Sequence, residues 1–208
     1  NCSDDGFFAV RVRRKEGKMI VVRLLRADAY KFGSSPYRLP WVKPVDEITF
    51  EGRPPFAFLE YRDEKLGLEL KLEAFTPFIP GDVKNSSIPA AIFKFIIENR
   101  SDHEVEVSLA TALKNPFSGL SREIIGVSEV KRKVGCTMIN MMGRNLSPDH
   151  PMEGGSLSLA VIGGQGVSAS AYVKKDNRSL ERFWVDLRKD GTVSGPQRYE
   201  GGDSHYVI

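Results

Sequence analysis

Alternation of apolar and polar residues with a period of two is the feature that most constrains this fold. In residues 66–74 apolar side chains occupy nearly every second position, and Glu69, Lys71 and Glu73 lie between them. Residues 105–113 repeat the pattern. Successive side chains of a strand point to opposite faces, so each segment would bury one face and expose the other. This arrangement is typical of antiparallel sheets, and the sequence therefore predicts an all-β fold.

Other segments of the chain extend this pattern. Alternation recurs in residues 8–12, 157–161, 167–173 and 183–187. We also expect a strand over residues 134–142, although a membrane-facing surface is an alternative there. Several short strands separated by turn signals predict a two-sheet antiparallel β-sandwich of the supersandwich type, with little helix. We expect it to form a single domain over residues 1–208.

Two segments depart from simple alternation. Residues 92–97 (IFKFII) are apolar at every position except Lys94, which predicts a central strand covered on both faces. Residues 120–133 are the best helical candidate, although Gly126 and β-branched residues weaken it. We identify no domain linker and no repeat.

Composition describes an ordinary soluble protein. The 208 residues carry a formal net charge of +3, and the basic residues are dispersed, so we expect no nucleic-acid partner. Cys2 and Cys136 are too few for a disulfide framework, which favours a reducing, cytoplasmic location. Five asparagines lie in Asn-x-Ser, a pattern of glycosylated secreted proteins, but Asn and Ser also co-occur in turns, and we favour turns.

Motifs for metal or nucleotide chemistry are not evident. The three histidines, His103, His150 and His205, lack ligand spacing, so we predict no metal site and no cofactor. Residues 163–166 (GGQG) precede an alternating segment instead of a helix, which favours a hairpin turn over a phosphate-binding loop. Carboxylates are plentiful, and a retaining glycosidase needs two held about 5 Å apart, but the sequence alone cannot pair them.

Aromatic side chains offer a candidate sugar-binding surface. Tyr37 and Trp41 lie in a proline-containing segment, and Trp184 lies in the alternating segment 183–187. Exposed aromatic rings can stack on the apolar face of a sugar. For Trp184 we favour packing within the protein or against another domain, and sugar contact or ordinary exposure are the alternatives.

The segment TPFIPGDVKNSSIP, residues 76–89, interrupts the regular pattern. Its prolines stop strand pairing, Gly81 permits a sharp bend, and Asp82, Asn85 and the serines can bond local backbone N–H groups. These features favour a rigid crossing between sheets over a ligand-binding loop. The residues that we expect to serve structure or interdomain contact are Pro77, Pro80, Gly81, Asp82, Asn85, Ser87 and Pro89.

The same region resembles a known family. The matching stretches are AFLEYRD (57–63), LEAFTPFIP (72–80), Asp82, NSSIP (85–89) and FKFIIEN (93–99). They are similar to the N-terminal domain of glycoside hydrolase family 116, the family of bile-acid β-glucosidase, or non-lysosomal glucosylceramidase. One departure is Asn85, where relatives often carry Asp.

The resemblance implies a retaining β-glucosidase in which a β-sandwich packs against an (α/α)6 domain that carries both catalytic carboxylates. This chain is too short to contain that domain, so we expect a non-catalytic accessory domain, or part of one. It would brace the catalytic domain, its partner, and help to shape the cleft for a β-glucoside or glucosylceramide-like substrate. Membrane association would be peripheral only. The alternatives are an independent carbohydrate-binding module and a structural or oligomerisation domain.

Overall fold

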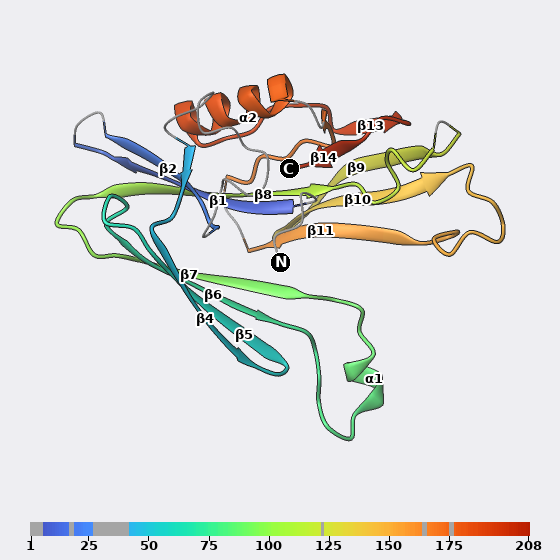
Figure 1. Cartoon of the computed structure of the whole chain (residues 1–208), viewed down its shortest axis with the longest axis horizontal. Coiled ribbons are helices and arrows are strands. Elements are labelled where there is room, and N and C mark those ends of the chain that lie inside the picture. The colour runs from blue at the N-terminus through green and yellow to red at the C-terminus, as the bar shows by residue number, and fades with distance from the viewer. Residues whose placement is uncertain (1–5, 17–18, 27–41, 122, 164–165, 175–176) are drawn as a thin grey trace. The chain divides into compact units, whose positions relative to one another are not determined.

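The computed structural model describes residues 6–16, 19–26, 42–121, 123–163, 166–174 and 177–208 (Figure 1). It confirms the mostly-β fold class, with 51% strand and 9% helix in several sheets and no closed barrel. The described parts of residues 1–11 and 107–208 form one compact unit, and those of residues 12–106 form a second. Each unit is described by itself below.

The strands form three sheets. The first has the order β12 (Val173–Lys174), β14 (His205–Val207), β8 (Val105–Lys114), β1 (Gly6–Arg14), β2 (Ile20–Leu24) and β3 (Val42–Pro44). The second has the order β11 (Ser156–Ile162), β10 (Cys136–Arg144), β9 (Ile125–Lys133) and β13 (Arg198–Gly201). The third has the order β4 (Glu47–Arg53), β5 (Phe56–Arg62), β6 (Leu68–Phe75) and β7 (Ile92–Asn99). Strands β2 and β3 pair in parallel, with Val22 opposite Val42.

The third sheet, in the unit of residues 12–106, has one apolar and one charged face. Its antiparallel register aligns Leu59 with Leu72 and Leu72 with Phe95. Residues two apart from these share their face, because strand side chains alternate. The apolar face therefore carries Ile48, Phe50, Leu59, Tyr61, Leu70, Leu72, Phe93, Phe95 and Ile97. Alternation in residues 66–74 predicted this two-faced strand correctly.

The position of β7 corrects one expectation. Residues 92–97 were predicted to form a central, doubly covered strand, but β7 is the outermost strand of its sheet and Ile92, Phe93 and Ile97 are exposed. Composition reports how apolar a strand is, whereas its place in the sheet depends on which segments pair with it.

A buried ion pair stabilises the same unit. Arg23 Nε donates to Asp63 Oδ2 at 2.5 Å, and the Asp63 side chain is completely buried. Asp63 Oδ1 also accepts the Lys65 backbone N–H at 3.0 Å, and Arg23 donates to the Val22 carbonyl. Both charges are thus hydrogen-bonded, as burial requires.

Helix α2 (Asn177–Asp190), in the other unit, corrects the strand expected over residues 183–187. Phe183, Trp184 and Leu187 are buried, and Val185 is exposed. This spacing of i, i+1 and i+4 is helical, because positions three and four apart share one helix face. Phe183 and Leu187 are four residues apart, a spacing that places two residues on one face of a strand and also on one face of a helix. Their spacing therefore did not distinguish the two structures.

The end of α2 is held by a side chain from β1. Arg11 is fully buried, and its guanidinium donates to the carbonyls of Arg188 at 3.1 Å and Lys189 at 3.3 Å. The last carbonyls of a helix have no partner within it, and a cation there also interacts favourably with the helix dipole. Gly191 follows at φ 78°, and a Cβ there would meet the Ser108 hydroxyl at 2.2 Å.

Three further expectations are settled in this unit. The expected helix over residues 120–133 is wrong, because residues 125–133 form β9 in register with β10. The strand expected over residues 134–142 is confirmed by β10. Of residues 167–173, only Val173 belongs to a strand. The backbone groups of Ser170 bond those of Ile208, and the Ala171 N–H bonds the Pro196 carbonyl, so this segment does not pair continuously with one strand. The buried side chains of Phe117, Ile139, Met141, Ala169 and Val207 form a hydrophobic core in this unit.

In the part of the chain that the structure describes, neither helix is long and apolar enough to span a membrane. No group of three or more His, Cys, Asp and Glu side chains in it could hold a metal ion.

Candidate functional site

The segment 76–89 joins β6 to β7 and projects beyond the ends of both strands (Figure 1). The two strands are neighbours in the third sheet, so the expected crossing between sheets is wrong. Strand β6 ends at Phe75, before Pro77, as the missing proline N–H predicts. Gly81 has φ 83°, a conformation that glycine adopts without strain. The short helix α1 (Val83–Ser86) follows, and we call the whole segment the β6–β7 loop.

Polar side chains of the β6–β7 loop bond within the loop. Asp82 caps α1, accepting the Asn85 backbone N–H at 3.0 Å and the Asn85 side-chain amide at 2.5 Å. Those hydrogen bonds, the backbone one first, lower the pKa of Asp82. Ser86 Oγ accepts the Ile79 N–H at 2.9 Å, and Ser87 Oγ donates to the Val83 carbonyl at 2.6 Å. The local bonding expected from the sequence is therefore present.

Apolar side chains of the same loop face solvent. The exposed fractions are 59% for Phe78, 50% for Ile79, 80% for Val83 and 49% for Ile88. The loop is therefore organised by its own polar groups and presents four large apolar side chains outward. Exposed apolar groups gathered in this way mark interaction surfaces.

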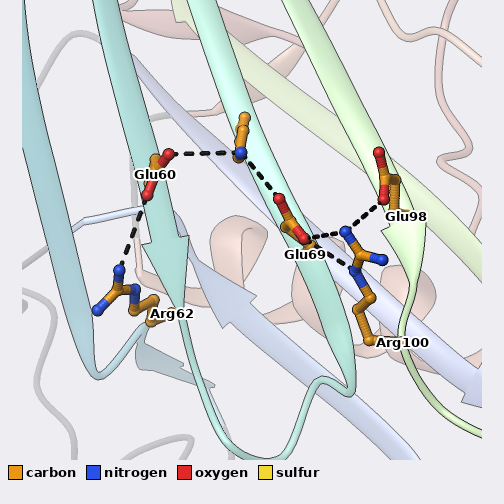
Figure 2. A network of polar contacts seen from close by, with 6 residues as sticks. Glu60, Arg62, Glu69, Glu98 and Arg100 are labelled. Atoms are coloured by element: carbon orange, nitrogen blue, oxygen red, sulfur yellow. Dashed lines mark hydrogen bonds and ion pairs between the residues drawn. The ribbon is translucent and has the colours of Figure 1, made fainter.

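A ladder of ion pairs crosses the charged face of the third sheet (Figure 2). Lys71 contacts Glu60 at 3.4 Å and Glu69 at 2.8 Å. Arg100 donates through Nε to Glu69 at 2.8 Å and contacts Glu98 at 2.7 Å. Glu60, Arg62, Glu69 and Lys71 also line an open groove of about 500 Å³.

The chemistry of this groove differs from that of a glycosidase active site. Hydrogen bonds from Lys71 and then Arg100 lower the pKa of Glu69, whereas a glycosidase general acid needs a raised pKa. Each charged side chain of the ladder pairs with a neighbour of opposite sign in the same ladder, as is common on an exposed sheet surface.

A second polar cluster lies in the other unit, where its tyrosines and its aspartate are half-buried. Tyr172 and Tyr199 both donate to the carboxylate of Asp203, and their rings stack with centroids 3.9 Å apart. Burial, with the Asp203 carboxylate, raises the pKa of Tyr199 to about 12. Ser128 Oγ lies 3.0 Å from His205 Nε2, but both residues are fully buried, so no substrate reaches the hydroxyl. Sequence spacing did not predict this cluster, because Ser128 and Tyr172 lie 77 and 31 residues from their partners His205 and Asp203.

We expect the free energy of unfolding to fall as the pH drops below about 6.5. Burial lowers the pKa of His205 below its unfolded value, so the unfolded chain binds more protons in this range and acid favours it. The slope is at most about 1.4 kcal/mol per pH unit for one group. Urea unfolding of the protein and of His205→Gln between about pH 5 and pH 7 measures it.

The matched control is His103→Gln, which replaces an exposed histidine and should keep the wild-type slope. Protonation of Asp203, whose pKa is also lowered, affects stability only at lower pH. An equal slope in His205→Gln would show that other groups carry the dependence.

Comparison with known families decides what kind of domain this is. The family model described as "beta-glucosidase 2, glycosyl-hydrolase family 116 N-term" matches residues 1–205. The chain belongs to glycosyl-hydrolase family 116. It is the N-terminal domain of a family 116 β-glucosidase, as the resemblance predicted. Membership of the family implies association with a family 116 catalytic region.

The family's sequence signature occupies contiguous parts of the third sheet. Residues 57–63 form most of β5 and end at the buried Asp63. Residues 72–80 cover the end of β6 and the start of the β6–β7 loop, and residues 93–99 lie in β7. Asp82 and Asn85 bond each other in the cap of α1.

Of the three aromatic candidates, the structure of this family 116 domain describes only Trp184. Trp184 is 8% exposed, and its indole stacks on Phe7 with centroids 5.2 Å apart. This burial favours the packing interpretation of Trp184. Tyr37 and Trp41 lie outside the described residues, so their role in sugar binding stays a prediction.

Proposed function

We propose that this domain braces the catalytic region of a family 116 β-glucosidase through the β6–β7 loop and contributes no catalytic residue itself. The observation that carries the proposal is the contrast within the loop. Its polar side chains bond inside the loop, while Phe78, Ile79 and Val83 point outward.

Burial of these side chains by a partner would be favourable. Full burial of one large apolar side chain contributes roughly 1.5–3 kcal/mol. The Asp82 cap and the serine bonds hold the loop before docking, so little conformational entropy is lost when a partner covers it. A rigid apolar projection therefore suits an interdomain contact better than contact with a polar sugar.

The substrate that we infer is that of the catalytic region, because this domain contributes no catalytic residue. We infer a β-glucoside or glucosylceramide-like substrate, hydrolysed with retention by carboxylates outside this chain. We also infer that the domain shapes one side of the cleft and that the enzyme is cytoplasmic, with at most peripheral membrane association. The family match supports the β-glucosidase part.

The triple variant Phe78→Ser/Ile79→Ser/Val83→Ser of the complete enzyme tests the bracing role. We expect its half-life at elevated temperature to fall about tenfold or more, because the interdomain contact loses apolar area. The 208-residue chain alone should keep its unfolding free energy within about 0.5 kcal/mol, because these side chains are exposed in it. Residual hydrolysis of an aryl β-glucoside after heating measures the half-life.

Val134→Ser is the matched control, since Val134 is a fully exposed apolar residue in the turn between β9 and β10. It should leave the half-life of the enzyme unchanged. Asp82→Ala, which removes the cap of α1, should shorten the half-life more than it slows hydrolysis. A triple variant as durable as the wild-type enzyme would refute the bracing role.

A further inference from the structure

The outer edge of the third sheet has an unusual sequence. Strand β7 is the last strand on its side of that sheet within the described residues. Five of its eight residues are apolar, in the order IFKFIIEN. Long apolar edge strands are templates for pairing with another chain, and natural proteins commonly block them with proline, bulges or charged side chains, lysine especially. Neither proline nor a bulge interrupts β7, whose register with β6 is continuous from Ile92 to Asn99.

The two charges on β7 are of opposite sign. Lys94 and Glu98 lie four positions apart, on the charged face, with Ile96 midway between them. Their side chains are 60% and 52% exposed. An edge strand that is protected from pairing with the same strand of a second copy would carry charges that repel that copy. These two charges attract one when the strands run antiparallel.

The register follows from this symmetry. In an antiparallel pair related by a two-fold axis through Ile96, residue 94 of one copy lies opposite residue 98 of the other. Directly opposed residues share a face, so two Lys94–Glu98 pairs form on the charged face. On the apolar face Ile97 lies opposite the position of Phe95. Shifting the centre by one residue separates the charges, so charge selects one register.

We propose that β7 pairs with β7 of a second copy of this chain, in antiparallel register about Ile96, to form a continuous eight-stranded sheet. The ion ladder then runs through the junction, since Lys94 also contacts Glu73 at 2.9 Å and Glu98 also contacts Arg100 at 2.7 Å. This self-association explains why residues 92–97 have the composition of a central strand although β7 lies at an edge. It does not depend on docking of the β6–β7 loop.

Charge reversal tests the register. Lys94→Glu and Glu98→Lys each place like charges opposite each other twice in the homodimer, and each should raise the dissociation constant about tenfold or more. In an equimolar mixture, the new carboxylate of one variant faces the new ammonium of the other. The mixture should therefore regain dimers near the wild-type affinity. Sedimentation equilibrium of the wild-type chain, each variant and the mixture measures this.

Arg53→Glu is the matched control, because Arg53 lies in β4, the opposite edge strand, and contacts Glu51 as Lys94 contacts Glu73. It should leave the dissociation constant unchanged. Thermal unfolding by circular dichroism confirms that each variant is folded. A monomeric wild-type chain, undiminished association of the single variants, or a mixture no better than its components would each overturn the proposal.

Discussion

Asp63→Ala should lower the free energy of unfolding by about 3–5 kcal/mol. The replacement leaves the guanidinium of Arg23 buried without its carboxylate, because the Arg23 side chain is only 9% exposed and Asp63 is completely buried. The Lys65 backbone N–H loses its acceptor as well. Removing one partner of a buried pair costs more than the pair contributes, since the remaining charge keeps its desolvation penalty. Urea unfolding followed by circular dichroism measures the change.

Two controls separate this effect from the loss of any carboxylate. Glu51→Ala removes the partner of the exposed Arg53 and should change stability by no more than about 1 kcal/mol. Replacing both buried partners, as Arg23→Met/Asp63→Leu, should recover most of the loss, because no unpaired charge remains. If Asp63→Ala were as mild as Glu51→Ala, the pair would not be buried in solution.

The second large effect is expected at the end of α2. Arg11→Met should destabilise the protein by about 2–4 kcal/mol, since it removes charge-assisted hydrogen bonds to the Arg188 and Lys189 carbonyls. Methionine retains most of the aliphatic stem but offers no donor, and the cation at the helix C-terminus is also lost. Chemical denaturation gives the magnitude, and hydrogen exchange of the last turn of α2 reports where the structure opens.

Arg13→Met provides the comparison from the same strand. The Arg13 side chain is half exposed and lies 3.9 Å from Glu106, so its loss should change stability by less than about 1 kcal/mol. Faster exchange at the end of α2 is expected only in Arg11→Met. Equal stabilities of the two variants would show that the guanidinium of Arg11 contributes little to holding the helix.

Local chemistry predicted much of the third sheet and its loop. The period-two pattern of residues 66–74 reports which side of β6 meets the core, and Leu70 and Leu72 are buried as it requires. In the β6–β7 loop, Asp82, Asn85 and Ser86 bond groups no more than seven residues away. Interactions over such short separations depend little on the rest of the fold, so a sequence can predict them.

Other features required the assembled chain. Arg11 meets carbonyls 177 residues away, and His205 meets Ser128 across 77 residues. Neither residue belongs to a sequence motif. Arginine side chains are usually exposed, so the sequence gives no reason to expect that Arg11 is buried. The candidate sugar contact at Trp184 depended likewise on burial against Phe7, which no local pattern indicates.

The sequence by itself determined the mostly-β class, the family and the turn chemistry of residues 76–89, because alternation and short-range hydrogen bonding are local properties. The tertiary structure decided that residues 177–190 form a helix, that β7 lies at an edge, and that Phe78 and Val83 face outward. The physical reason is that burial and strand order arise from contacts between distant segments. An apolar side chain favours burial, but only the fold determines which segment buries it.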